Sequence, residues 1–273
     1  MSGHNEFVIG DHQLTIEEIV RIARDKNVKV TLSEQTKSKI LAARKVVEEL
    51  VAEKKVVYGV TTGFGMFKTE AISSDKVQDL QKNLIRSHAI GTGAPFSEEV
   101  VRAAILIRAN SLSHGHSGVR LELIELLLSV LNAGLYPYVP CKGSVGASGD
   151  LAPLSHLTLV MMGEGEVWED GARIPAGPIL QQKNLTPIVL EAKEGLAMNN
   201  GTSFMTAVAC LNVFQGELLV KQYDLILGLT LEAVSGTLAA YEERVHALRP
   251  HKGQGICAAN IRTICAGSQI LAS

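Results

Sequence analysis

The chain has 273 residues, in which 26 lysine and arginine residues against 28 aspartate and glutamate residues give a formal net charge of −2. This near-neutral balance argues against a protein that binds nucleic acid through its phosphate groups. An aromatic share of 4% also argues against a protein that binds single-stranded nucleic acid by stacking the bases on aromatic side chains. At about 100–200 residues per domain, the length allows one large domain or two small ones.

The pattern of apolar residues predicts a mainly helical fold with minor β structure. The predicted elements, in chain order, are short strands within 6–31 around a helix opened by Thr15, a long helix from Ser33 to about Lys54, a helix at 75–90, helices opened by Ser97 and Ser117, a helix from about Leu151 to Gly163 and a β-hairpin at 167–174. Residues 203–240 are too apolar for a solvent-facing helix, so they are assigned to a helical bundle. The predicted division is a domain at 1–202 and an incomplete bundle at 203–273.

Cysteine spacing and the N-terminal sequence bear on compartment. The four cysteines include no CxxC pair, so we interpret them as reduced, mostly buried residues and expect no metal site. Residues 1–12 lack the basic and apolar parts of a signal peptide. The uncharged stretch 195–216 carries too many amides and hydroxyls for a membrane span. We therefore expect a cytoplasmic protein with neither a membrane nor a nucleic acid as partner.

The segment Gly146-Ala147-Ser148-Gly149-Asp150 lies in a glycine-rich loop before a predicted helix. Taken alone, it is typical of a turn in which Asp150 caps the helix, whose free N–H groups concentrate positive potential on the loop. The Gly-x-Ser-x-Gly spacing of a serine nucleophile is absent, because Gly146 and Asp150 stand two residues on either side of Ser148.

The wider segment 143–156, GSVGASGDLAPLSH, resembles the signature of the aromatic amino acid ammonia-lyase family, which includes the histidine ammonia-lyases. Further segments resemble the family in the same order along the chain: 58–65, 83–88, 108–120, 194–202 and 249–254. The resemblance covers nearly the whole chain and corresponds to the N-terminal half of a family member. It implies a lyase domain that leads into the long helices of a truncated central bundle.

The resemblance implies a prosthetic group made from the chain itself, with no external cofactor. Ala147, Ser148 and Gly149 would cyclise into methylidene-imidazolone. The Gly149 nitrogen attacks the Ala147 carbonyl carbon, which needs small residues, and Ser148 then loses water. A helix N-terminus beside the ring would stabilise negative charge that develops when a nucleophile adds.

The implied reaction is elimination of ammonia from a small α-amino acid substrate. Tyr58 matches the family's general base, which removes a β-proton, and Asn200 matches the asparagine that polarises the ring carbonyl. Ser87 and His88 resemble the Ser-His pair of histidine ammonia-lyases, and Gly65 falls in the same substrate-binding set. An imidazole at His88 could hydrogen-bond a substrate imidazole, which favours conversion of L-histidine to urocanate.

Two departures from the histidine pattern keep other substrates open. Thr61 and Thr62 stand where many histidine enzymes carry Asn-Thr, and Ser203 stands where they carry glutamine. The alternatives of the same class are a phenylalanine or tyrosine ammonia-lyase or an aminomutase.

Family enzymes are tetramers whose active sites combine several subunits, so the resemblance also implies a homo-oligomer. The arginine that holds the substrate carboxylate belongs to the C-terminal half of family members. An alternative of another class is therefore a catalytically incomplete half-subunit that forms a complex with a C-terminal half chain.

Overall fold

The computed structural model describes residues 5–62, 76–145, 147–169 and 171–271. The described chain is mainly helical with short strands, which confirms the predicted fold class. It separates into two compact units, residues 1–211 and 212–273, and each is described by itself. The division predicted at residue 202 stays a prediction.

The N-terminal unit opens with a small parallel β-α-β element. Strand β1 (Glu6–Ile9) pairs with β2 (Lys29–Leu32), and α1 (Ile16–Arg24) supplies the crossover that parallel pairing needs. Thr15 opens α1 as predicted, through a capping box in which its side chain accepts the Glu18 N–H and the Glu18 carboxylate accepts the Thr15 N–H.

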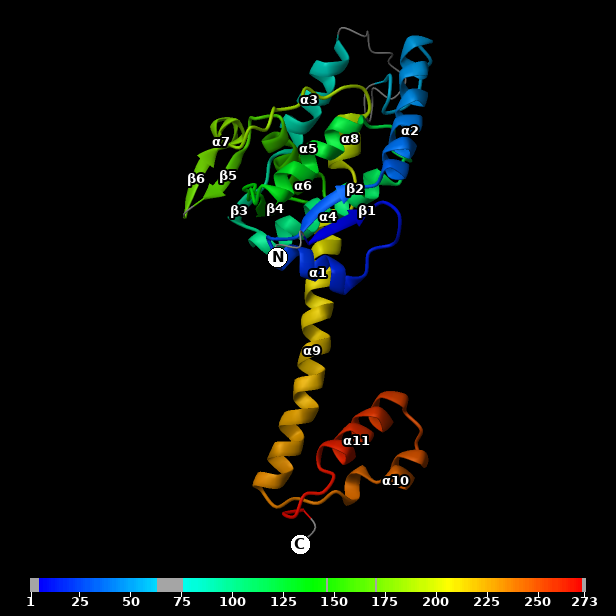
Figure 1. Ribbon diagram of the computed structural model, residues 1–273, viewed down its shortest axis with the longest axis vertical. Helices are drawn as coiled ribbons and strands as arrows, with labels where there is room; N and C mark the ends of the chain where they lie inside the picture. The colour runs from blue at the N-terminus through cyan, green and yellow to red at the C-terminus, as the bar shows by residue number, and fades with distance from the viewer. Residues whose placement is uncertain (1–4, 63–75, 146, 170, 272–273) are drawn as a thin grey trace. The chain divides into compact units, whose positions relative to one another are not determined.

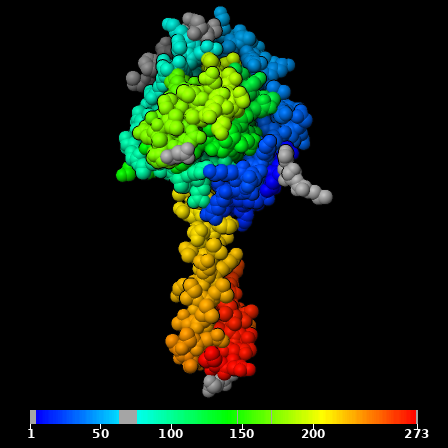
Figure 2. All heavy atoms as spheres, turned by 60° about the vertical axis from the view of Figure 1, so that its left-hand side comes forward, coloured from blue at the N-terminus to red at the C-terminus, as the bar shows by residue number. Residues whose placement is uncertain are grey.

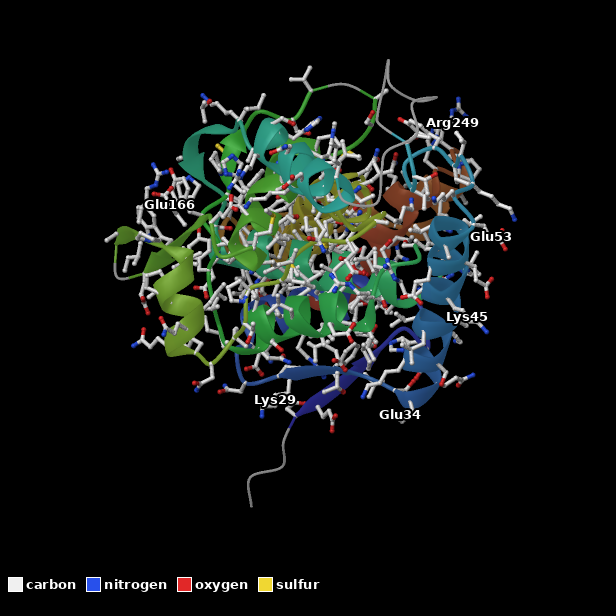
Figure 3. The ribbon with its side chains drawn as sticks, turned by 90° about the horizontal axis from the view of Figure 1, so that it is seen from above. Lys29, Glu34, Lys45, Glu53, Glu166 and Arg249 are labelled. Carbon is white, nitrogen blue, oxygen red and sulfur yellow. The ribbon has the colours of Figure 1, made fainter. Side chains whose placement is uncertain are left out.

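Figure 1 shows how the helices of the N-terminal unit are arranged. The described residues of this unit form a large apolar core and a smaller apolar cluster that contains Val47, Val60, Val77 and Ala192. The helices are α2 (Glu34–Ala52), α3 (Val77–His88), α4 (Glu98–Ser113), α5 (Leu121–Asn132), α6 (Leu151–Met161), α7 (Ala176–Gln182) and α8 (Glu194–Asn199). Ser33 caps α2 as predicted. The α2 side chains Lys45 and Glu53 point away from the core (Figure 3), whereas Val47 is buried.

Two antiparallel strand pairs complete this unit. β3 (Thr92–Pro95) pairs with β4 (Pro140–Lys142), and the predicted hairpin forms from β5 (Glu166–Glu169) and β6 (Ala172–Pro175). Trp168 of β5 stacks on Tyr138, with ring centroids 5.7 Å apart.

Two predicted helix boundaries are wrong. The helix expected to open at Ser117 begins at Leu121, with Arg120 at its N-cap, because Gly118 has φ of +66° and cannot continue a helix. The helix expected to reach about Ala240 is α9 (Ser203–Ala233), which ends before Ser235 at φ of +50°.

In the C-terminal unit the last part of α9 packs against α11 (Lys252–Ile264), and Figure 2 shows their orange and red atoms side by side. The Asp224 carboxylate of α9 accepts hydrogen bonds from the Cys257 thiol and the Asn260 amide. The 3-10 helix η3 (Ala239–Tyr241) and the short helix α10 (Glu243–Ala247) connect the two long helices.

Many large apolar side chains of α9 are exposed in this unit: Leu218, Leu219, Val220, Tyr223, Leu225, Ile226 and Leu229. By length and composition alone, the helical stretch 194–233 could cross a membrane, and the core helix of a bundle passes the same test. These apolar side chains are thus exposed over much of this part of α9.

Candidate functional site

The loop between β4 and α6 carries the tripeptide Ala147–Gly149. Ala147 and Ser148 lie exposed in a turn, and the Ser144 hydroxyl donates to the Gly149 carbonyl oxygen over 3.0 Å. Gly149 has φ of +102°, and a Cβ there would lie closer than 3.0 Å to the Gly201 carbonyl oxygen. Both the positive φ and the close approach of the Gly201 carbonyl therefore require glycine at position 149. Small side chains and close main-chain packing fit a tripeptide that closes on its own backbone.

Asp150 joins this loop to two helices. It is the N-cap residue of α6, but its side chain makes no capping hydrogen bond to that helix. Instead, the Asp150 carboxylate accepts the Met205 N–H over 2.9 Å, in the first turn of α9, and the Asp150 N–H donates to the Gly201 carbonyl over 2.6 Å. The cap that the pentapeptide alone favours is therefore not formed on α6, and the first N–H groups of α6 keep their positive potential beside the loop.

Asn200 and Gly201 form the turn between α8 and α9, and the Asn200 side chain is exposed. Glu194 fixes the other end of α8. Its fully buried carboxylate accepts from the Arg120 guanidinium at 2.6 and 2.9 Å and from the backbone N–H groups of Arg120 and Glu191. The adjacent Asn199 side chain is also buried, and neither of its amide atoms has a hydrogen-bond partner among the described residues.

Ser87 and His88 end α3. The His88 Nδ1 lies 2.8 Å from the Leu84 carbonyl oxygen and 3.1 Å from the Ser87 hydroxyl. A carbonyl only accepts, so Nδ1 carries the proton in this arrangement and Nε2 is the acceptor nitrogen of the neutral ring.

Gly91, three residues beyond His88, connects this segment to α6. Its N–H donates to Nε2 of His156 over 3.0 Å. Burial, with a smaller contribution from the Arg173 charge, lowers the pKa of His156 below its usual value, which keeps the ring neutral and able to accept. A Cβ on Gly143, at the start of the loop, would lie 2.9 Å from the Gly91 Cα. The Ser87–His88 segment is thus tied to the base of the tripeptide loop.

Tyr58 lies in the turn that follows α2 and is 58% exposed. The hydroxyls of Thr61 and Thr62 hold this turn, by accepting the Val57 N–H over 2.9 Å and the Gly59 N–H over 3.3 Å. Both threonines therefore act on the backbone that presents Tyr58. Gly65 lies outside the described residues.

The structure brings two of the predicted sites into direct contact, namely the loop at Gly149 and the turn at Asn200–Gly201. It ties the Ser87–His88 segment to that loop through Gly91, and it places Tyr58 on a separate segment. Sequence reasoning assigned no role to Arg108 or His156. An arginine in the middle of the apolar sequence of α4 was the available signal for Arg108.

Comparison with known protein families identifies the family to which the chain belongs. The family model for aromatic amino acid lyases matches residues 14–273, and the chain belongs to that family. This confirms the resemblance seen in the sequence.

Several relatives of known name resemble this chain along nearly all of its length. The chain is 47% identical to a histidine ammonia-lyase of Caldanaerobacter subterraneus subsp. tengcongensis, over 97% of this chain and 52% of the relative. Among solved structures, it matches a tyrosine aminomutase from Streptomyces globisporus with a TM-score of 0.89 and 35% identity, over 97% of this chain and 50% of that one. It matches the histidine ammonia-lyase from Trypanosoma cruzi with a TM-score of 0.87 and 36% identity, over 94% and 49%. The chain spans about half the length of the curated relatives it matches.

Proposed function

We propose that this chain is the electrophile-bearing half of an ammonia-lyase that removes ammonia from L-histidine. The observation that carries the proposal is the loop at 147–149, which packs against the Asn200–Gly201 turn at the N-terminus of α6. Relatives 45–47% identical are histidine ammonia-lyases, and they share this half of the chain.

The proposed prosthetic group is methylidene-imidazolone made from Ala147, Ser148 and Gly149. It supplies an electrophilic methylidene carbon to which the substrate amine adds, so that ammonia leaves more easily. The loop supports its formation in three ways. Gly149 has no side chain beside its attacking nitrogen, and its positive φ turns the backbone back on itself. The Ser144 hydroxyl donates a hydrogen bond to the Gly149 carbonyl oxygen. The first N–H groups of α6 supply positive potential where negative charge develops.

The remaining residues are proposed in three roles. Tyr58, presented by the turn that Thr61 and Thr62 hold, removes the β-proton as general base. Asn200 polarises the carbonyl beside the reacting carbon. The His88 Nε2, the acceptor nitrogen when Nδ1 donates to Leu84, accepts the N–H of a substrate imidazole. Ser87 and Gly65 are assigned to the same substrate-binding set.

The exposed apolar face of α9 supports an assembly that supplies the rest of the site. We propose that these side chains are covered by helices of further subunits in a homotetramer, or by a separate C-terminal half chain. The cytoplasmic location proposed for the protein rests on its four cysteines, which are free of disulfides.

The first test is intact mass spectrometry of the purified chain. Loss of two waters is expected from wild type and not from Ser148→Ala, which lacks the hydroxyl that leaves. An unmodified wild-type mass would favour the incomplete half-subunit, whose loop closes only with a partner.

The second test offers L-histidine, L-phenylalanine and L-tyrosine to the chain, alone and with the C-terminal half of the Caldanaerobacter relative added as a second chain. Ultraviolet absorption of urocanate is expected, and only with both halves present. Formation of cinnamate, coumarate or a β-amino acid instead would replace the histidine assignment by the lyase or aminomutase alternatives, which the likeness to tyrosine aminomutase keeps in view.

A further inference from the structure

Arg108 is a buried cation on α4 that no proposed step uses. It is 5% exposed, and its guanidinium Nη2 donates to the carbonyl oxygens of Ala197 and Asn200, the latter over 2.8 Å. Both carbonyls belong to the last turn of α8, where helix geometry leaves carbonyl groups without intrahelical donors. Arg108 thus supplies hydrogen-bond donors to the C-terminal end of α8 and to its C-cap residue Asn200.

The turn beyond that helix end contacts both Arg108 and the tripeptide loop. A Cβ at Gly201 would overlap the Arg108 Nη1, so the guanidinium packs directly against the turn. The Gly201 carbonyl accepts the Asp150 N–H over 2.6 Å and lies against Gly149. Arg108 and Gly149 therefore contact the same turn.

The electrostatic setting keeps Arg108 charged at neutral pH. Burial lowers its pKa to about 10, and the nearby Asp150 carboxylate opposes that shift. The pKa of Lys193 is also lowered, by its own burial and by the Arg108 charge. A guanidinium is thus held in the interior, where hydrogen bonds from a charged donor are stronger than between neutral groups.

We propose that Arg108 is a positioning residue that fixes the Asn200–Gly201 turn as the wall against which the loop at 147–149 folds for ring closure. This rests on the proposed function, in which a bond forms between the Gly149 nitrogen and the Ala147 carbonyl carbon. The Ala147 oxygen leaves as one water, and the Ser148 hydroxyl leaves with the Cα hydrogen of the same residue as the second. Arg108 touches neither the substrate nor the reacting atoms, and it acts through the turn.

Arg102 provides a matched control on the same helix. It is also buried, and its guanidinium donates to three carbonyls, those of Ile22, Ala23 and Leu131, all remote from the loop. Replacing either arginine by methionine removes a buried guanidinium of similar size. Only the Arg108 change removes donors from the turn at Asn200.

The test measures two quantities in Arg108→Met, Arg102→Met and wild type. The first is the fraction of chain whose intact mass has lost two waters. The second is the hydrogen-exchange rate of the Asp150 and Met205 amides, which report the contacts to Gly201 and Asp150. We expect Arg108→Met to lower the fraction of chain that has lost two waters. We expect it to raise the exchange rates of the two amides by about tenfold or more, which is the effect of losing a hydrogen bond to a charged group. Arg102→Met should leave both quantities near their wild-type values.

A second variant keeps the test decisive if Arg108→Met does not fold. In Arg108→Ala, guanidinium chloride below denaturing concentrations is expected to restore the mass loss and amide protection, whereas sodium chloride is not. Wild-type mass loss in folded Arg108→Met, or equal effects from Arg102→Met, would overturn the proposal. If wild type itself loses no water, the proposed ring fails in this chain, and the amide-exchange comparison alone decides whether Arg108 holds the turn.

Discussion

Replacing Gly149 by alanine tests whether the loop is held by contact with the Asn200–Gly201 turn. At φ of +102° a side chain strains the backbone by about 2 kcal/mol. The new Cβ would also displace the Gly201 carbonyl, which accepts the Asp150 N–H, and losing that hydrogen bond costs about 1 kcal/mol more. We expect Gly149→Ala to lower the free energy of unfolding by about 3 kcal/mol.

Gly134→Ala is the matched control, because Gly134 has φ of +66° and a Cβ added there would meet no atom within 4 Å. Only backbone strain remains there, about 1 kcal/mol. The assay is urea unfolding followed by the fluorescence of Trp168, the single tryptophan, which reports on the N-terminal unit. Equal losses in the two variants would refute the contact between Gly149 and Gly201 as a source of stability.

Three further changes test other parts of this unit by urea unfolding. Arg120→Met leaves the buried Glu194 carboxylate without its cation and should lower the free energy of unfolding by about 3–5 kcal/mol, and a loss below about 1 kcal/mol would contradict a buried ion pair. Asn199→Leu replaces a buried amide that has no hydrogen-bond partner among the described residues, and it should raise the free energy of unfolding by about 1–3 kcal/mol. A lower urea midpoint would instead show that the Asn199 amide has a hydrogen-bond partner. Burial lowers the folded-state pKa of His156 below 6.5, so the unfolded chain binds the proton first as pH falls. The stability that neutral His156 contributes is therefore present above pH 6.5, and it is lost as pH falls through the folded-state pKa. His156→Gln, whose amide oxygen can accept the Gly91 N–H, should lose less on going from about pH 7.5 to about pH 5.5, and an unchanged pH dependence would exclude His156 as a source.

Local signals predicted the elements whose causes lie within a few residues. Thr15 with Glu18 marks the start of α1, Ser33 marks the start of α2, and the Asp-Gly pair at 170–171 in the sequence marks the hairpin. The start of α5 was missed because the turn at Gly118, rather than the serine before it, decides where the helix can begin.

Contacts within the candidate site lie beyond local signals because their partners are far apart in the chain. The Arg108 guanidinium meets a carbonyl 92 residues away, and the Asp150 carboxylate meets an N–H 55 residues away. Residue type predicts that a buried arginine needs acceptors, but not which carbonyls supply them. The motif therefore identified the tripeptide and Asn200, whereas the packing that joins them needed the three-dimensional structure.

The link from Asp150 to the first turn of α9 sets an order of events during synthesis of the chain. The ribosome makes the loop at 147–149 well before it makes Gly201 and Met205, which hold the loop's flank through Asp150. A nascent chain that ends before Met205 therefore carries residues 147–149 but lacks the contact between the Asp150 carboxylate and the Met205 N–H. The contacts that Asp150 makes beside this loop can therefore form only after the first turn of α9 has been translated.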